Sequence, residues 1–524
     1  MQKKILKKIR LITAFILFIG ISAIFIDFRQ WITPPFVKVF LYLQLVPSLI
    51  NFMHVFSITA GGFLFVVMLT LLFGRVYCSF ICPLGILQDI FIFIAKKTKR
   101  IRVFRYAKAH TIIHYGFFAL TLISVLAGSM LILSLLDPYS IFGRIQNDMV
   151  KPLVVVINNS IAPVLESKHI FWLYPIDLVP LNNVVFIISS ISLLILVFLS
   201  LSHGRLYCNT VCPAGALLRM LSKRAWLRIR IDANGCTACY RCSMVCKAHC
   251  IDIKTNTVDF DRCVACYNCI EACPSYAIAY VPHKTSKRKE TTDMEKRKFF
   301  TATMAYMAGL WFIADKLYAG LQKQKNAKTM QGYIRNEKTH PVSPPGSQSI
   351  KHFTSTCTAC HLCVSACPTK VLQPAYLEYG LSGMMQPYMD FSAGFCNYDC
   401  TLCGEMCPTG AIKPLSVNAK HTTQTGIVHF VRNNCVVYTD NTSCGACSEH
   451  CPTKAVYMVP YKDGLTIPET DVSICIGCGA CEYACPLSPP YKAIYVNGNA
   501  VHQKASRPII EKMEQPAIHD DFPF

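Results

Sequence analysis

The residues best suited to chemistry in this sequence are its 29 cysteines, most of which fall into regularly spaced groups. Six groups of four follow the pattern C-x2-C-x2-C-x3-C or a close variant of it. In one variant the first gap has an extra residue, and in another it opens to eight. The groups are Cys236, Cys239, Cys242 and Cys246; Cys263, Cys266, Cys269 and Cys273; Cys357, Cys360, Cys363 and Cys367; Cys396, Cys400, Cys403 and Cys407; Cys435, Cys444, Cys447 and Cys451; and Cys475, Cys478, Cys481 and Cys485.

This spacing predicts iron–sulfur ligation. Three thiolates two residues apart wrap a loop around one face of a four-iron cubane, and in two-cluster ferredoxins the fourth cysteine ligates the partner cluster. A four-cysteine zinc site fits less well, because it uses paired C-x2-C arms with a longer spacer. The crossover rule gives six [4Fe-4S] ligand sets: Cys236, Cys239, Cys242 with Cys273; Cys263, Cys266, Cys269 with Cys246; Cys357, Cys360, Cys363 with Cys407; Cys396, Cys400, Cys403 with Cys367; Cys435, Cys444, Cys447 with Cys485; and Cys475, Cys478, Cys481 with Cys451.

Four of the remaining cysteines belong to an internal repeat. The segment GRVYCSFICPLG, with Cys78 and Cys82, is matched by GRLYCNTVCPAG, with Cys208 and Cys212. The i, i+4 spacing places each pair on one helix face. Thiols that only pack in an interface of small residues are one interpretation. Reactive residues duplicated in a membrane instead favour a functional site, and four thiolates can hold a cluster or a soft ion such as Cu(I). We favour a further metal or redox centre there.

The composition of the chain indicates that part of it lies in a membrane. The 524 residues are 52% hydrophobic and only 16% charged, with a mean hydropathy of +0.35, so part of the chain is expected in lipid. The net charge of +22 could indicate nucleic-acid binding. The excess Lys and Arg flank apolar segments, however, which is the pattern of the positive-inside rule. A soluble enzyme, a disulfide scaffold and a disordered chain are excluded.

Four apolar segments are expected to cross the bilayer, at residues 11–27, 55–73, 111–135 and 183–202. The loops between them alternate between many and few Lys and Arg residues. This alternation places the N-terminus and residues 203–298 on the cytoplasmic side of a bacterial inner membrane. A fifth segment, 299–314, follows Lys296-Arg297-Lys298, which resembles a twin-arginine export signal. Its 16 residues also suit a buried or interfacial helix. If it spans, the later cysteine groups are extracytoplasmic.

The predicted fold is an α-helical multi-pass membrane domain joined to α+β bacterial ferredoxin-like modules, each with two [4Fe-4S] clusters. The predicted divisions are a four-span domain (1–230), a first ferredoxin domain (231–285), a basic linker with the fifth segment (286–325), a second module (340–415), a third module (425–500) and a tail (501–524). Cys250, His110 and His114 receive no assigned role. Cys250 is expected to be a free, partly buried thiol.

Residues up to about 285 resemble the NapH family, with four spans, two C-x3-C-P motifs and a two-cluster ferredoxin domain. Residues 296–500 resemble the NapG/MauM ferredoxin family, through the uneven gaps before Cys400 and Cys444 and the twin-arginine-like lead. The resemblance implies a fusion of the two partners that passes electrons from a quinol to an extracytoplasmic reductase or cytochrome. It would be a quinol-dehydrogenase-like component rather than a stand-alone enzyme.

A second resemblance is kept as an alternative. The C-x3-C-P membrane core is shared with the CcoG cupric reductases, which implies a metal reductase or assembly factor. That family is expected to end in a β-sandwich rather than in more cysteine groups. No nucleophile triad, phosphate-binding glycine loop or flavin signature is visible in the sequence.

Overall fold

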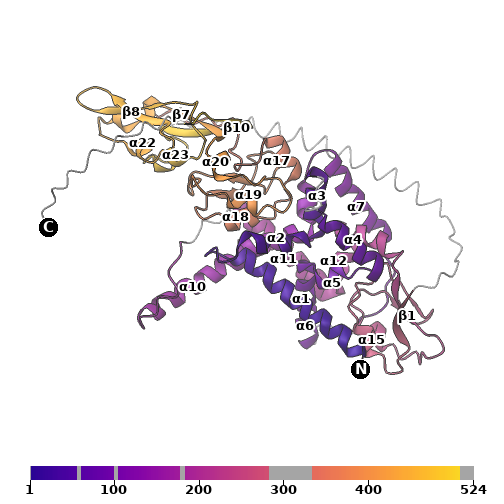
Figure 1. The fold of residues 1–524 in the computed structure, drawn as a ribbon. Coiled ribbons are helices and arrows are strands. Elements are labelled where there is room, and N and C mark those ends of the chain that lie inside the picture. Colours follow the sequence, from indigo (N-terminus) through magenta and orange to yellow (C-terminus); the bar gives the residue numbers. More distant parts are fainter. Residues whose placement is uncertain (1, 56–60, 99–103, 178–182, 283–332, 508–524) are drawn as a thin grey trace, which may run out of the picture.

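The computed structural model describes residues 2–55, 61–98, 104–177, 183–282 and 333–507. The fifth apolar segment, its twin-arginine-like lead and most of the basic linker lie outside the described residues, as does the tail beyond residue 507. Figure 1 shows a helical domain with one small cysteine-rich domain near the N-terminus and two more at its far side.

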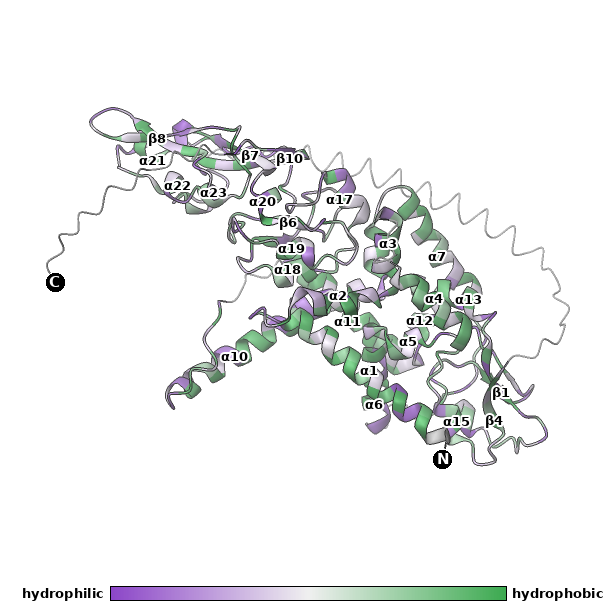
Figure 2. Cartoon of the chain, viewed as in Figure 1, coloured by the Kyte–Doolittle hydropathy of each residue, from purple (hydrophilic) through white to green (hydrophobic). Residues whose placement is uncertain are grey.

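The N-terminal domain is entirely helical over its described residues. Its elements are α1 (Gln2–Ile26), α2 (Pro34–Tyr42), α3 (Leu45–Val55), α4 (Gly62–Phe73), α5 (Tyr77–Phe80), α6 (Pro83–Lys97), α7 (Thr111–Leu126), α8 (Leu131–Leu136), α9 (Pro138–Ile145), the π-helical η2 (Gln146–Val150), α10 (Lys151–Glu166), α11 (Asn183–His203), α12 (Leu206–Thr210) and α13 (Pro213–Ser222). Most of these helices are coloured largely green, for hydrophobic residues, in Figure 2.

Two of the four expected spans are long apolar helices. Residues Ile5–Ile26 and Asn183–His203 are long and apolar enough to cross a membrane. Within the other two expected spans the apolar helices described are shorter: Gly62–Phe73 and Thr111–Leu126. Helices α2 and α3 form a bent apolar pair with an angle of 101°.

One long helical run was not expected from the sequence. Residues Pro138–Glu166 form a continuous run through α9, η2 and α10 that is also apolar enough to span, in a stretch where we expected a loop. Asp137 caps it by accepting a hydrogen bond from the Ser140 amide at 2.8 Å, and Pro138 occupies the first turn. Arg144, Asp148 and Lys151 interrupt its apolar pattern, which explains why a hydropathy reading misses it.

The first cysteine module (residues 227–282) is a small α+β unit. It contains β1 (Leu227–Ile231), α14 (Arg241–Met244), β2 (Ile251–Asp252), β3 (Thr257–Val258), α15 (Asn268–Ala272) and β4 (Ile278–Pro282). The outer strands pair antiparallel with Leu227 opposite Pro282, and β2 pairs with β3.

The second module (residues 340–415) and the third module (residues 423–504) are also small α+β units. The second contains α17 (Ile350–Thr356), α18 (Leu362–Ala366), β5 (Leu372–Pro374), β6 (Pro387–Met389) and α19 (Leu402–Glu405), followed by α20 (Val417–Lys420). The third contains β7 (Thr423–Phe430), η3 (Arg432–Asn434), α21 (Val436–Thr439), α22 (Ala446–Glu449), β8 (Val456–Pro460), β9 (Thr466–Thr470), α23 (Ala480–Ala484) and β10 (Ile494–Lys504). The paired strands are β5–β6, β8–β9 and β7–β10, all antiparallel.

Helix α1 touches the first module at one end and the second module at the other. Near its start Lys7 forms an ion pair with Glu271, and near its end the Phe25 carbonyl accepts a hydrogen bond from the Ser365 hydroxyl. Its 25 residues correspond to about 37 Å at 1.5 Å per residue, close to the thickness of a bilayer. The two modules therefore lie at opposite ends of the helical domain (Figure 1).

Other helices run between the same two ends. Gly74, just after α4, packs on Phe260 of the first module, while His54 of the preceding α3 lies 3.3 Å from the Thr356 hydroxyl of the second. At the far end of α11 the Arg205 amide donates to the Lys247 carbonyl of the first module at 2.9 Å. Gly143 of α9 lies so close to the Cys360 carbonyl that a Cβ would come within 2.2 Å of it.

A buried carboxylate ties these parts together. Asp89 of α6 is 8% exposed and pairs with Arg10 of α1, with Arg205 at 2.8 Å and with Lys247 of the first module at 3.1 Å. Burial alone would raise the pKa of Asp89, but the three cations more than offset it and hold the pKa well below its usual range. This stabilisation is full above about pH 4 and is lost only as the pH falls towards that lowered pKa.

Asp89→Asn is expected to destabilise the chain by about 3–5 kcal/mol, because it leaves buried cations without a counter-charge. The measurement is the guanidinium unfolding midpoint of detergent-solubilised protein at pH 7. Asp463→Asn, at an exposed loop carboxylate, is the matched control and should behave like the wild type. Equal midpoints for Asp89→Asn and wild type would contradict this role.

Candidate functional site

The six cysteine sets expected from the crossover rule come together in the structure. In the first module one cavity is lined by Cys236, Cys239, Cys242 and Cys273, and another by Cys246, Cys263, Cys266 and Cys269. In the third module a cavity is lined by Cys435, Cys444, Cys447 and Cys485. Each cavity takes three cysteines from one motif and the fourth from its partner motif.

The other three sets are close enough for their thiols to interact electrostatically. Cys363 interacts with Cys357, Cys360 and Cys407. Cys403 interacts with Cys396, Cys400 and Cys367. Cys481 interacts with Cys478, Cys475 and Cys451. Whether each set holds a cluster remains a prediction, but the donor arrangement fits the group that the spacing implies.

Backbone conformation shapes these loops. Residues between the cysteines adopt the left-handed region, with φ of +50° at Ala238, +59° at Tyr240, +51° at Ala359 and +62° at His361. Alternation of right- and left-handed residues turns successive amides toward the same concavity, which suits an anionic group. The Ala359 amide, for example, donates to the Cys357 Sγ at 3.4 Å. The third module uses glycine at an equivalent place, with φ of +77° at Gly479.

Burial controls the protonation of these thiols. Desolvation, with a smaller contribution from Cys407, raises the pKa of Cys360 to about 12. Desolvation and Cys444 likewise raise the pKa of Cys447 to about 12. Metal ligation by these two cysteines would release a proton from each, because thiolate is the binding form. Among the described residues, no group of three or more His, Cys, Asp or Glu side chains is placed to hold a single metal ion.

The four cysteines of the repeat, Cys78, Cys82, Cys208 and Cys212, are all buried, at 3–4% exposure, and interact electrostatically with one another. The repeat arranges them reciprocally. Arg75 donates to the Cys208 carbonyl at 2.8 Å and lies 3.8 Å from the Cys78 Sγ. Arg205 donates to the Cys78 carbonyl at 2.7 Å and lies 3.9 Å from the Cys208 Sγ. Each copy of the repeat therefore holds the other through a buried guanidinium.

Glycine makes this exchange possible. A Cβ on Gly85 would lie 2.2 Å from the Cys78 carbonyl oxygen, and one on Gly215 would lie 2.3 Å from the Cys208 carbonyl oxygen. The same two positions also face the guanidiniums of Arg205 and Arg75. The glycine that ends each C-P-x-G sequence is thus required by close approach of backbone and side chain.

Sequence reasoning missed several residues of this site. Arg75 and Arg205 are fully buried, and their place in the repeat was a signal that could have revealed them. Lys247, which stands where proline follows the other motifs, reaches Asp89. His114 is buried with its Nε2 at 3.1 Å from the Cys212 carbonyl, whereas His110 is exposed.

Cys250 is a fifth thiol in one cavity of the first module. It is 1% exposed and its Sγ lies 3.5 Å from that of Cys246. It is therefore fully rather than partly buried.

Comparison with known families finds 4Fe-4S domains over most of these cysteine groups. Residues 58–101 and 185–234, which contain the two copies of the repeat, match a family described as a 4Fe-4S binding domain. Residues 256–279 match another 4Fe-4S binding domain. Residues 356–412 and 442–488 each match a 4Fe-4S dicluster domain. The chain therefore contains ferredoxin-type iron–sulfur domains.

Its relatives are ferredoxin-type proteins. It is 29% identical to the ferredoxin-type protein NapF of Escherichia coli (strain K12) over 136 residues, which are 26% of this chain and 74% of NapF. It is 29% identical to the methylamine utilization ferredoxin-type protein MauM of Methylophilus methylotrophus over 203 residues, 37% of this chain and 83% of MauM. It is 30% identical to E. coli NapG over 161 residues, 30% of this chain and 63% of NapG. No solved structure matches.

The expected resemblance to NapG and MauM is thus confirmed, and the chain is similar to ferredoxin-type electron-transfer proteins. The NapH-like character of residues 1–285 stays a prediction.

Anaerobically purified protein is expected to contain about 24 non-haem irons in its ferredoxin modules, four per cubane. The double variant Cys435→Ala/Cys444→Ala should lose about four of them, because it removes half of one ligand set. Cys250→Ala should lose none, since its cavity already has four cysteines. Iron and zinc analysis with EPR checks this. Stoichiometric zinc in place of iron would contradict the assignment.

Proposed function

We propose that this chain is a membrane-bound electron conduit that connects the quinol pool with a redox protein partner through six [4Fe-4S] clusters. A [4Fe-4S] cluster, when bound, takes up and returns one electron at a time. The 24 cysteines of the six sets would hold these clusters, and Cys78, Cys82, Cys208 and Cys212 would hold a further centre between the modules.

One observation carries this proposal. A single buried core extends from Cys266 of the first module, through all four membrane-domain cysteines, to Cys360 of the second module. Tyr77, Tyr139 and Tyr207 belong to the same core, and Tyr139 interacts with Cys360 electrostatically. A continuous path of packed, buried side chains between two cysteine sets is what a conduit needs.

The chain's own residues would prepare the middle centre. The guanidiniums of Arg75 and Arg205 lie close to sulfur and offset the negative charge that thiolates carry. His114 fixes the Cys212 loop by its contact with the Cys212 carbonyl. These groups orient the sulfurs and exclude water.

The same proposal includes orientation. With the first module in the cytoplasm, as the Lys/Arg distribution predicts, the second and third modules lie on the extracytoplasmic side. The contacts of the first and second modules with opposite ends of α1 support this placement. The cupric-reductase alternative is weaker, because the chain continues into two dicluster domains where that family was expected to form a β-sandwich.

A reporter fused after residue 340 is expected to score extracytoplasmic, and one fused after residue 224 cytoplasmic. The paired use of alkaline phosphatase, active outside, and green fluorescent protein, fluorescent inside, checks both positions. A cytoplasmic score at both places would contradict the proposed topology.

Cys82→Ser is expected to interrupt transfer between the modules while leaving their clusters assembled, because it removes one ligand of the middle centre. The protein is placed in quinone-free liposomes with a membrane-impermeant reductant outside. EPR then measures the clusters on the sheltered side, which should be reduced in wild type and remain oxidised in Cys82→Ser. Ser79→Ala, at a buried position in helix α5 just before Cys82, is the control and should match the wild type. Normal reduction in Cys82→Ser, with normal iron, would make the membrane-domain cysteines packing residues.

A further inference from the structure

A cavity of about 370 Å³ lies where the helical domain meets the second module. Unlike the cavities described above, it is not lined by a four-cysteine set. Its walls come from the end of α1, from η2 and α10, from the start of α11 and from the loop after α18. Its volume is in the range of small-molecule sites.

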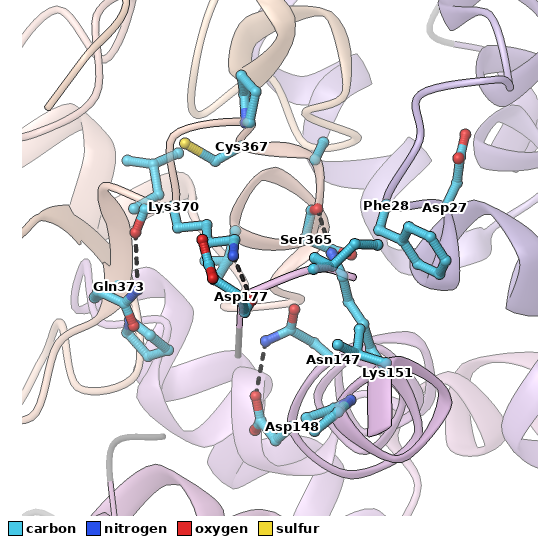
Figure 3. Close-up of a pocket in the computed structure, with 18 of the residues that line it drawn as sticks. Asp27, Phe28, Asn147, Asp148, Lys151, Asp177, Ser365, Cys367, Lys370 and Gln373 are labelled. Atoms are coloured by element: carbon cyan, nitrogen blue, oxygen red, sulfur yellow. Dashed lines mark hydrogen bonds between the residues drawn. The ribbon is translucent and has the colours of Figure 1, made fainter. Parts of the chain in front are cut away.

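The cavity combines apolar walls with polar groups on opposite sides. Phe28, Val155 and Phe186 supply apolar surface, and Asn147, Asp148 and Lys151 supply donors and an acceptor. Figure 3 shows Asn147, Asp148 and Lys151 on one side, with Lys370, Asp177 and Gln373 on the other. A flat ring with an oxygen at each end fits this distribution.

Hydrogen bonds to neighbouring residues hold the polar groups of the cavity in place. Asp148 is 4% exposed and accepts hydrogen bonds from Ser189 at 2.6 Å and Asn147 at 2.8 Å. Lys151 donates to the Ser365 hydroxyl at 2.9 Å. Asn147 and Asp148 lie in the π-helical segment η2, and such segments are frequent at functional sites.

The cavity also has the right neighbours for a lipid-soluble redox ligand. Cys367, one of the expected cluster ligands, lines it directly. The cavity wall includes Tyr174, and Arg29 lies 4.9 Å from the ring centroids of both Tyr174 and Trp31. Trp31 and Trp172 are 69% and 76% exposed, as expected of aromatic side chains at a membrane–water interface.

We infer that this cavity binds the head group of an isoprenoid quinol. The inference rests on the proposed function and adds the place and the residues. Lys151 and Asn147 donate to one oxygen of the ring. In the quinol form this oxygen is a hydroxyl, and Asp148 accepts a hydrogen bond from it. Oxidation of the quinol to the quinone breaks two O–H bonds and releases two protons to water at the mouth of the cavity. A cluster held by the Cys367 set would supply the one-electron acceptor for each of the two electrons.

The test uses the full-length holoprotein in quinone-free lipid nanodiscs and the fluorescent quinol analogue 2-heptyl-4-hydroxyquinoline N-oxide. Lys151→Met removes the donor, and Val155→Trp fills the cavity without removing a hydrogen bond. Each is expected to weaken analogue binding about tenfold or more. Lys168→Met, at an exposed lysine beyond α10, is the matched control and should bind like the wild type. If Lys151→Met loses iron from the second module, Val155→Trp decides.

Reduction by a menaquinol analogue, compared with reduction by dithionite, distinguishes failure of the cavity assignment from failure of the proposed function. The inference is supported if the wild type binds the analogue and is reduced by the quinol, and if the cavity variants bind the analogue more weakly. Normal binding in the variants, with the wild type still reduced by quinol, overturns the cavity but not the proposed function. A wild type that binds no analogue and is reduced only by dithionite overturns both.

Discussion

The structure depends on a single buried carboxylate, Asp89, that must be shared by three cations. Arg10 comes from α1, Arg205 from the second copy of the repeat and Lys247 from the first module. None of these cations could be buried alone at acceptable cost. Their common partner therefore fixes where the first helix, the repeat and the first module meet. Because Lys247 directly follows Cys246, the same contact positions a cysteine loop against the helical domain.

The repeat also uses buried cations to join separate parts of the chain. Each guanidinium serves the backbone of the other copy, so neither hairpin has a complete set of hydrogen bonds without its partner. The four cysteines are brought together as a consequence of that exchange. The second module is held differently, by close backbone approach at Gly143 and by polar contacts of Ser365 with Phe25 and Lys151.

The sequence was informative where local spacing determines structure. The C-x2-C-x2-C-x3-C motifs predicted which cysteines meet across partner motifs, because ligand loops are short-range features, and the observed cavities group them accordingly. The helical domain was predicted less well. Hydropathy located α1 and α11 but missed the run Pro138–Glu166, whose Arg144, Asp148 and Lys151 face polar partners that only tertiary structure provides. The cavity beside Cys367 was equally invisible, because its walls come from segments more than 300 residues apart.

The separation of the modules along α1 has an energetic consequence for the proposed conduit. In that arrangement an electron that passes from one end of the helix to the other moves through the low-dielectric layer of the membrane. Such a step does electrical work of about 2.3 kcal/mol per 100 mV of membrane potential. The balance of reduced centres between the two ends would then respond to the voltage of the cell as well as to the intrinsic potentials of the clusters. A protein with all its clusters on one side of a bilayer would have no such sensitivity.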